Sequence, residues 1–568
     1  MKDRKRLIII IVIALLLIHI PLAAIIISGR GSTWNYLLQK EKIEKKHSRS
    51  EVSGNDTRGE DVEEGLVRLA NDHPLGSLDV AKNAEDYYVA LNVFDRLLEE
   101  DTEEGTHKIR PSLAKEWKVS DDGKTYSFTL RDDVYFSDGT KLTSEDVKVS
   151  FSRLLSVENS EQVGYANMIV GAENVLAGRS DTLSGIEIID DTHFDIKLKE
   201  AFPSYLNMLC SPACSILSSK CVREAGASYG EDVAYVIGTG PYIVTENSDD
   251  RCVLERNSHY YNEEPSVKKA VMEILTPAEM DVSFREGELD LLDLDFINPD
   301  TVGRYFENED YADHVITMDN LEIIGLMINC DISPLNDVRV RKAIQHAIDR
   351  DRLKAEVRGG YATLNDGIFP KGLKGYSEAN QGWLKYDPEE AKRLLKEADV
   401  DERDKIELVI SSTSDRYTQK ITQYVHEDLL AVGINADIVI YDSESSSYLR
   451  RMGGVMAYRY NWVADYDDPD NFIYSIFGNE DITRKKSSCY KDEETFERIE
   501  NARFISDEEE RLAEYARLER KLVEEDAVWV PFYSSQHSYV MGKRVESFEP
   551  YWTGWSEIPL DGIILRKQ

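Results

Sequence analysis

Cysteine is scarce in this sequence, and its placement limits the sites that it can form. The chain of 568 residues has six cysteines: Cys210, Cys214, Cys221, Cys252, Cys330 and Cys489. An even count outside the cell allows disulfides, but their pairing cannot be read from a sequence. The close group at 210, 214 and 221 has neither the spacing of a zinc module nor a histidine beside it, so a local disulfide or buried thiols are favoured over a metal site.

Basic residues are also in deficit. Acidic residues number 106 against 68 Lys and Arg, which gives a net charge of −38 and a pI near 4.7. Such a field repels phosphate backbones, so we expect no nucleic-acid partner. Aromatic residues make up 9% of the chain, which is typical of folded rather than disordered protein. The length allows two to four domains.

Signatures of catalysis are missing. There is no phosphate-binding GxxxxGK, and the glycine pair Gly238 and Gly240 lacks the third glycine of a dinucleotide loop. His426-Glu427 begins like a zinc-protease motif, but Leu430 occupies the second histidine position, and no GxSxG elbow occurs. We therefore expect a protein that is not an enzyme and that carries neither cofactor nor metal.

The N-terminus predicts a membrane anchor. A basic flank (1–6) precedes an apolar run from Leu7 to Ile27, interrupted only by His19 and Pro21. At about 1.5 Å per residue this run spans a hydrocarbon core of about 30 Å, and the basic flank orients the rest of the chain outward. A cleaved signal peptide is the alternative, although no clean small-x-small cleavage site follows. No cysteine lies near the end of the run, which excludes a lipid-modified N-terminal cysteine.

A polar stretch, Ser28 to Glu64, reads as a tether, and apolar patterning begins after it. Strands and helices then alternate, which predicts an α/β protein with mixed or parallel sheets. Residues 126, 128 and 130 are expected to form a half-buried strand of a hairpin after the Asp122-Gly123 turn. Ser144 is expected to cap a helix with Val147, Phe151 and Leu154 on one face.

The second half of the chain follows the same pattern. Asp387-Pro388 predicts a helix start, with Ala391, Leu394, Leu395 and Ala398 as the apolar stripe. Strands are expected at 406–410 and 434–440 with a helix at 418–430 between them. A long charged helix is expected over 507–527, with Leu512, Ala516, Leu522 and Val523 facing inward.

Six segments in order carry a resemblance to a known family. They are Pro111 to Arg153, GTGPY (238–242) with LERNSHYYNEEP (254–265), GELD (287–290), NDVRVRKAIQHAIDRDRL (336–353), YDPEEAKRLLKEA (386–398) and NWVADYDDPDNF (461–472). In this order the sequence resembles the extracytoplasmic solute-binding proteins of peptide ABC transporters, the dipeptide and oligopeptide receptors of solute-binding family 5. The resemblance covers residues 66 to 548, and most of its residues are turns, caps and core.

The resemblance implies a two-lobed periplasmic-binding-protein-like (type II) fold with an inserted domain. By analogy, residues 66–98, 223–320 and 527–568 form lobe I, residues 99–222 form the inserted domain, and residues 321–526 form lobe II. The anchor (1–28) and tether (29–65) precede them. The ligand is expected in the cleft between the lobes, and the protein is expected to be a monomer that delivers peptides to ABC permease subunits.

The same resemblance implies the residues that bind a peptide. The family's amine-binding carboxylate corresponds to Asp465, in a motif that begins at Trp462. A capping role in the turn beside Asp467 and Asp468 is the alternative for Asp465. Cations for the peptide carboxylate are expected at Arg459, at Arg358 and near Arg416-Tyr417, and Tyr165 of the inserted domain is expected to stack on the peptide; a surface role is open for each.

Some features depart from the family. Its lipid-anchored cysteine is missing, and the apolar helix at 7–27 would replace it, which indicates a receptor held at the cell membrane. The stretch 448–458 is shorter than in oligopeptide receptors, so the depth of the pocket is open. Receptors of this fold for nickel complexes, sugars or other solutes are the alternative, as is a sensor that reports a peptide signal without transport.

Overall fold

The fold is built from β-sheets whose strands come from distant parts of the chain. The structure is a computed structural model that describes residues 63–83, 86–103, 106–400, 404–554 and 557–567. Glu64–Gln568 group as one compact unit. No helix in these described ranges is long and apolar enough to cross a bilayer. The expected anchor and, apart from its last two residues, the expected tether (28–64) lie outside them.

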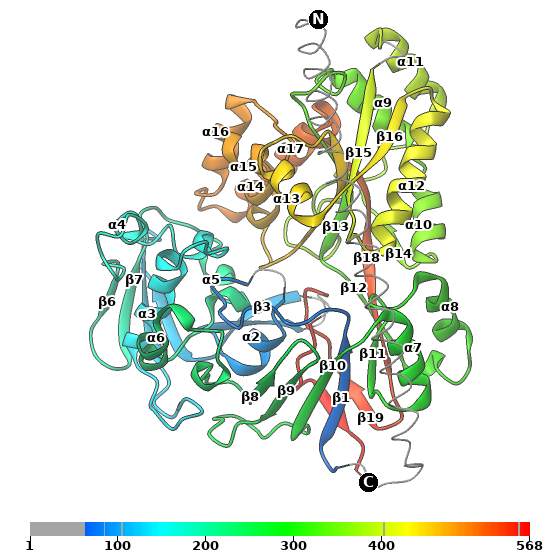
Figure 1. Cartoon of the computed structure of the whole chain (residues 1–568). Coiled ribbons are helices and arrows are strands. Elements are labelled where there is room, and N and C mark those ends of the chain that lie inside the picture. The colour runs from blue at the N-terminus through cyan, green and yellow to red at the C-terminus, as the bar shows by residue number, and fades with distance from the viewer. Residues whose placement is uncertain (1–62, 84–85, 104–105, 401–403, 555–556, 568) are drawn as a thin grey trace, which may run out of the picture. The chain divides into compact units, whose positions relative to one another are not determined.

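One sheet joins the start of the described chain to residues near 270. Its order is β1 (Leu66–Asn71), β10 (Lys269–Ile274), β9 (Arg251–Arg256) and β8 (Tyr242–Asn247). β1 runs parallel to β10, and the other neighbours are antiparallel (Figure 1). Val67 and Leu69 are fully buried and alternate with the half-buried Leu66, Arg68 and Ala70, as the two-residue period of a strand requires.

The GTGPY segment that leads into β8 has a packing explanation. A Cβ atom at Gly238 would lie 1.8 Å from the carbonyl oxygen of Val93, and one at Gly240 would lie 2.8 Å from the Val93 carbonyl carbon. Only glycine lets the two backbones approach so closely. This motif therefore serves the scaffold and not the ligand.

A separate sheet has the order β4 (Ala114–Val119), β5 (Thr125–Leu130), β7 (His193–Lys197) and β6 (Ile186–Ile188). The predicted hairpin is confirmed, because β4 and β5 pair antiparallel around a turn in which Gly123 has φ +67°.

The helix α3 (Ser144–Ser156) packs on this sheet with Val147, Phe151 and Leu154 buried as predicted. Its predicted cap is wrong by one residue. Thr143 is the N-cap and forms a capping box with Asp146, because the Asp146 carboxylate accepts hydrogen bonds from the Thr143 backbone and hydroxyl.

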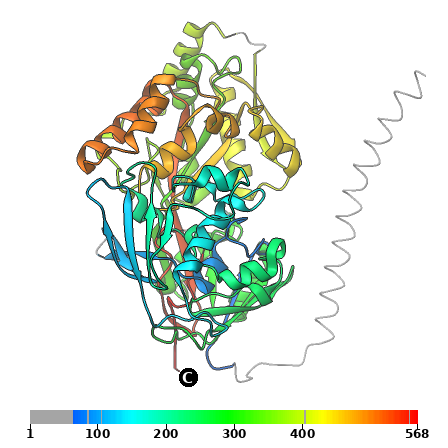
Figure 2. The ribbon, with the colours of Figure 1, turned by 90° about the vertical axis from the view of Figure 1, so that its left-hand side faces the viewer.

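The largest sheet is organised around one long strand. Its main path is β11 (Leu291–Asp293), β18 (Trp529–Met541), β13 (Glu322–Ile328), β17 (Ala457–Val463), β15 (Lys405–Ser411) and β16 (Asn435–Tyr441), and β12 (Val315–Asp319) and β14 (Ala362–Leu364) also pair with β18. The first part of β18 pairs with β13 and β14, and its last part pairs with β11 and β12. β18 is the long orange-red strand that runs through the middle of both ribbon views (Figures 1 and 2).

The predicted α/β order around residues 387–441 is confirmed. α11 (Pro388–Ala398) begins after Asp387, whose side chain accepts a hydrogen bond from the Glu390 backbone. β15 and β16 run parallel, and α12 (Arg416–Ala431) connects them, as a parallel pair requires.

The inward face predicted for residues 507–527 is partly wrong. α17 (Glu508–Arg520) continues as a π-helical turn (Lys521–Glu525) in which Leu522 and Val523 are buried, but Leu512 and Ala516 are only half-buried. The buried face of α17 instead includes charged residues such as Arg511, which pairs with Asp468. Apolar periodicity misses such a face, since an ion pair occupies it.

The remaining elements connect these sheets and cover their faces. They are β2 (Leu98–Glu103), β3 (Thr106–Pro111), β19 (Val545–Phe548), β20 (Ile563–Leu565), α2 (Tyr88–Val93), α4 (Ala172–Leu176), α5 (Tyr205–Met208), α6 (Ser219–Ala225), α7 (Pro277–Glu286), α8 (Pro299–Glu307), α9 (Val338–Ala347), α10 (Arg350–Arg358), α13 (Ser443–Arg451), α14 (Asp470–Phe477), α15 (Glu480–Lys485) and α16 (Glu493–Ala502).

All six cysteines are free thiols, so the local disulfide considered for Cys210, Cys214 and Cys221 does not form; these three are buried. The domain boundaries stay a prediction. The predicted boundary at 526/527 falls just before β18, a strand that pairs with elements of both predicted lobes.

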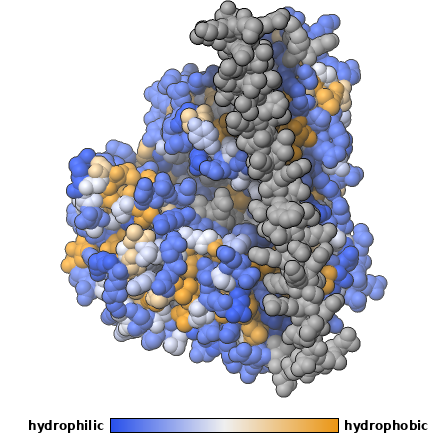
Figure 3. Space-filling view, viewed as in Figure 1, coloured by the Kyte–Doolittle hydropathy of each residue, from blue (hydrophilic) through white to orange (hydrophobic). Residues whose placement is uncertain are grey.

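The face shown in Figure 3 is mainly hydrophilic. This agrees with the high content of charged residues, 31% of the chain.

Candidate functional site

The segment predicted to hold the ligand follows directly from β17. In this strand Tyr458, Tyr460 and Trp462 alternate with Arg459 and Asn461, so the two sets lie on opposite faces of the sheet. The aromatic set faces the core that includes Trp529, whose ring meets that of Tyr460 edge to face at 6.0 Å. The chain then leaves the sheet and enters α14.

Asn471 of α14 holds this segment in place. Its Oδ1 accepts hydrogen bonds from Trp462 Nε1 (3.1 Å) and from the backbone N of Asp465 (3.0 Å). Its Nδ2 donates to Asp465 Oδ2 at 2.8 Å. The Asp465 carboxylate is thereby oriented before any ligand arrives, as pre-organised binding requires.

Tyr165 reaches the same carboxylate from the inserted region. Its buried hydroxyl accepts a hydrogen bond from Ser211 Oγ (3.2 Å) and is hydrogen-bonded to Asp465. Its ring also meets that of Tyr466 edge to face, with centroids 6.4 Å apart. Tyr165, which is distant in sequence from the motif of Trp462 and Asp465, therefore lies together with them.

Asp465 is a half-buried carboxylate. No ion pair to it is formed within the part of the chain that the structure describes. Burial raises its pKa to about 6, against the hydrogen bond from Asn471 and the charge of Lys486. A carboxylate with such a pKa is under-compensated, and a cationic ligand group would lower its energy.

The neighbouring acids in the motif, Asp467, Asp468 and Asp470, all bind other groups of the protein. Asp468 forms a buried ion pair with Arg511 (2.6 Å), and Asp470 pairs with Arg503 (3.0 Å). Asp467 accepts a hydrogen bond from the Lys374 backbone (2.6 Å). The turn-capping alternative fits these residues better than Asp465, which leaves Asp465 as the acid of this segment that a ligand can use.

Lys486, which the sequence did not single out, lies beside Asp465. Its Nζ is 4.7 Å from the ring centroid of Trp462 and 5.6 Å from that of Tyr460. Burial and the charge of Arg450 lower its pKa to about 8, against the attraction of Asp465 and Glu161.

Arg459 lies on the opposite face of β17. Its Nη1 donates to Asn461 Oδ1 at 2.7 Å, and its Nη2 is 3.9 Å from Glu322 Oε1. Its buried Nε has no hydrogen-bond partner in the described residues. The guanidinium therefore has a donor to spare, although Glu322 already balances part of its charge.

Arg358 is more fully engaged. Its Nη2 donates to Asp295 Oδ1 and to the Gln536 carbonyl, both at 2.9 Å, and its guanidinium lies 4.8 Å from the ring centroid of Tyr417. Arg416 beside Tyr417 is exposed. The structure thus brings Arg358 and Tyr417 into contact. Burial raises the pKa of Tyr533 in β18 to about 12, and the positive charges of Arg358 and Arg459 oppose that rise.

The two groups of residues are separated along the chain. Asp465 is six positions after Arg459, which corresponds to at most about 20 Å in an extended chain. The ligand-binding roles of Asp465, Trp462, Tyr165, Arg459, Arg358 and Tyr417 stay predictions.

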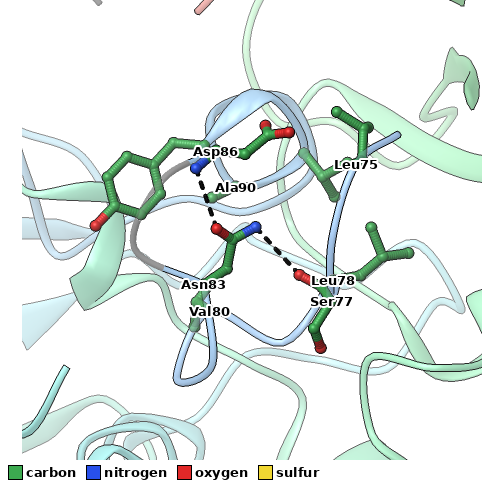
Figure 4. Close-up of a pocket in the computed structure, with 9 residues that line it drawn as sticks. Leu75, Ser77, Leu78, Val80, Asn83, Asp86 and Ala90 are labelled. Carbon is green, nitrogen blue, oxygen red and sulfur yellow. Dashed lines mark hydrogen bonds between the residues drawn. The ribbon is translucent and has the colours of Figure 1, made fainter. Parts of the chain in front are cut away.

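Two partly open pockets lie elsewhere. One of about 10 Å³ is lined by residues 75–90 and has room for a single water at most; in it, Asn83 bridges the Ser77 carbonyl and the Asp86 backbone (Figure 4). Another of about 150 Å³ is lined by residues that include Pro334, Val340, Leu395 and Ile434. Neither is lined by a predicted ligand residue. In the ranges that the structure describes, no group of three or more His, Cys, Asp or Glu could hold a metal ion.

Comparison with known proteins reveals one family. The family model described as bacterial extracellular solute-binding proteins, family 5 Middle, matches residues 108–484. The dipeptide-binding protein of Escherichia coli (strain K12) is 29% identical over 449 residues, which cover 75% of this chain and 81% of that protein. The nickel-binding periplasmic protein of the same organism is 27% identical over 475 residues, 80% and 86% of the two chains.

A solved structure supports the fold. The ABC transporter-associated periplasmic binding protein DppA from Helicobacter pylori, in complex with the peptide STSA, has a TM-score of 0.75 at 24% identity, and the match covers 89% of this chain and 98% of that one. Such relatives have two-lobed α/β folds, which confirms the predicted fold class in outline.

Proposed function

Since the chain belongs to the bacterial extracellular solute-binding proteins of family 5, we propose that it captures short peptides outside the cytoplasm and passes them to an ABC permease. Relatives in this family include a dipeptide-binding protein and a nickel-binding protein, so membership alone does not decide the ligand. The chemistry of the site supports a peptide with a free amino terminus. The chain would bind and release this ligand without making or breaking a bond.

The observation that carries the proposal is the state of Asp465. Its carboxylate is half-buried, is oriented by Asn471 and has no ion-pair partner in the described residues. An α-ammonium would supply the missing charge and donate to the free lone pairs. Trp462 and Tyr165, which adjoin this carboxylate, would cover the first residues of the peptide.

The other end of the peptide would meet the arginines. Arg459 has an unpartnered Nε, and Arg358 lies against Tyr417. A separation of at most about 20 Å between Arg459 and Asp465 would suit an extended peptide of roughly three to five residues, at about 3.3 Å per residue plus the reach of the side chains. Asp295 already neutralises Arg358, so we assign the first carboxylate contact to Arg459.

Calorimetry on the full chain tests this function. We expect tripeptides with a free amino terminus to bind at least 30-fold more tightly than their N-acetylated forms, which corresponds to about 2 kcal/mol. Asp465→Asn should reduce the two affinities to the same low value. Equal binding of free and acetylated peptides would contradict the amine role of Asp465. Tight binding of a nickel chelate without any peptide binding would show that the ligand is a metal complex and not a peptide.

The position at the membrane is also part of the proposal. The apolar run at 7–27 would hold the receptor at the membrane by a single pass, with the tether at 28–64 leaving the binding unit free to reach the permease. We expect the protein to stay in the membrane fraction after alkaline extraction. Release into the soluble fraction at a reduced mass would indicate a cleaved signal peptide instead.

A further inference from the structure

Lys486 is a second unsatisfied charge beside Asp465. It follows α15 directly, and its half-buried side chain crosses the rings of Trp462 and Tyr460 at 4.7 and 5.6 Å. Its Nζ forms neither a hydrogen bond nor an ion pair with any residue of the described ranges. The rings stabilise the cation partly, because their faces are negative, but they do not replace a carboxylate.

The charged groups around Lys486 influence its protonation, but none of those in the described residues forms an ion pair with it. Asp465 and Glu161 attract it and Arg450 repels it, while burial is the largest influence on its protonation. Glu161 is an exposed residue, and Arg450 is exposed above the Tyr458 ring at 5.8 Å. The Tyr460 hydroxyl below this group is also buried without a hydrogen-bond partner in the described part of the chain.

The charge balance indicates what is missing. Asp465 and Lys486 attract each other across Trp462, yet no ion pair joins them in the described residues. A ligand that brought only an ammonium to Asp465 would place a second cation near Lys486. A ligand whose ammonium is accompanied by a carboxylate satisfies both protein groups, and each charge then has an opposite neighbour.

We propose that Lys486 binds the side-chain carboxylate of an acidic first residue, so that the receptor prefers peptides that begin with Asp or Glu. This inference rests on the proposed peptide function and names the peptide class within it. In such a residue the ammonium and the side-chain carboxylate are a few bonds of about 1.5 Å apart, so one residue can reach both protein groups. Trp462, which contacts Lys486 and shares Asn471 with Asp465, would form the floor between them.

The test compares three tripeptides on the full chain by calorimetry: Glu-Ala-Ala, Gln-Ala-Ala and Lys-Ala-Ala. We expect Glu-Ala-Ala to bind at least tenfold more tightly than Gln-Ala-Ala, with Lys-Ala-Ala weakest. Lys486→Met keeps the length of the stem on Trp462 and should bring the Glu and Gln peptides to equal affinity. Lys485→Met is the matched control, because Lys485 is exposed and pairs with Asp481 at 2.7 Å; it should leave the preference unchanged.

Two results would overturn the inference: equal affinity of the wild-type chain for the Glu and Gln peptides, or a preference that survives Lys486→Met. Lys486→Gln, checked by thermal melting, provides a second variant if the first does not fold. Failure of the peptide function itself looks different, because then none of the three peptides binds or acetylated peptides bind equally well.

Discussion

At the scale of single residues, neighbouring acids in one segment differ through their partners. Asp468 and Asp470 are each paired with an arginine, Arg511 and Arg503, so these acids already have a cation within the protein. Asp465 has only uncharged hydrogen-bond partners, and its raised pKa indicates that its charge costs stability in the free protein. A charge that destabilises the free protein is available for a ligand.

Replacing Asp465 should therefore separate binding from stability. The folded pKa of about 6 lies above the unfolded value of about 3.9, so the stability contributed by this group is present below the unfolded value and is lost as pH rises through 6. At pH 7, Asp465→Asn should raise the free energy of unfolding by about 1 kcal/mol while abolishing peptide binding. Urea unfolding measures this. Asp468→Asn is the contrasting variant and should lower the free energy of unfolding by about 3 kcal/mol, because it leaves the buried Arg511 charge without its carboxylate. A loss of stability in Asp465→Asn would contradict the account.

The pH dependence of binding gives a second prediction for the same residue. The α-ammonium of a peptide stays protonated and its carboxylate stays ionised between pH 7 and pH 5, so the change in this range reports Asp465. Protonation of Asp465 below its pKa of about 6 should weaken binding by about tenfold at pH 5. Calorimetry at both pH values checks this, and a flat profile in the wild-type chain would argue against an ionised Asp465 as the amine partner.

At the scale of elements, local sequence patterns predict structure well where the local chain decides it. The hairpin at residues 114–130, the start of α11 and the β15–α12–β16 order follow from turn residues, caps and apolar spacing. The inward face of α17 was not predictable, because Arg511 is buried through Asp468, 43 residues away. Periodicity reports burial of apolar side chains and misses a buried ion pair.

The same limit applies to the candidate site. The family resemblance led to Asp465 and Trp462 through one motif and to Tyr165 in the predicted inserted domain, and the structure brings the three together. Lys486 lies in a run of polar residues (483–488), and no motif or spacing there indicates a ligand-binding role. The engagement of Arg358 by Asp295, 63 residues away, could not be read from the sequence either. Resemblance to a family indicates which positions bind the ligand. Contacts between residues far apart in the sequence decide which of the charged side chains there already have a partner in the protein.

The close backbone contact between Gly238, which precedes β8, and Val93 of α2 yields a prediction about stability. Gly238→Ala places a Cβ atom 1.8 Å from the Val93 carbonyl oxygen, and the backbone on both sides must move. We expect a loss of at least about 3 kcal/mol in urea unfolding. Gly76→Ala is the control, because a Cβ atom there meets nothing within 4 Å, and it should be nearly neutral. A Gly238→Ala chain as stable as the control would show that this contact is not tight in solution.

At the scale of the whole binding unit, β18 connects the halves of the largest sheet, and buried charges lie along it. His537 of β18 forms ion pairs with Asp293 (3.0 Å) and Asp295 (3.2 Å), and Asp295 also receives Arg358 from α10. Although burial opposes protonation, the two carboxylates raise the pKa of His537 to about 10. The cluster connects elements of the two predicted lobes.

This cluster predicts how stability changes in alkali. The pKa of His537 rises from about 6.5 unfolded to about 10 folded, so its contribution is fully present below pH 6.5 and is lost as pH rises through 10. At pH 7, His537→Gln should lower the free energy of unfolding by roughly 3 kcal/mol. The difference from wild type should shrink at pH 11. A difference that is the same at both pH values would show that the imidazolium charge does not stabilise the junction.

The central claim is most directly tested by a crystal structure of the full chain with a bound Glu-Ala-Ala peptide. The account predicts that the peptide ammonium lies within about 3 Å of a carboxylate oxygen of Asp465, between Trp462 and Tyr165. A complex in which the ammonium points to solvent, and in which Asp465 keeps only its bonds to protein groups, would contradict it.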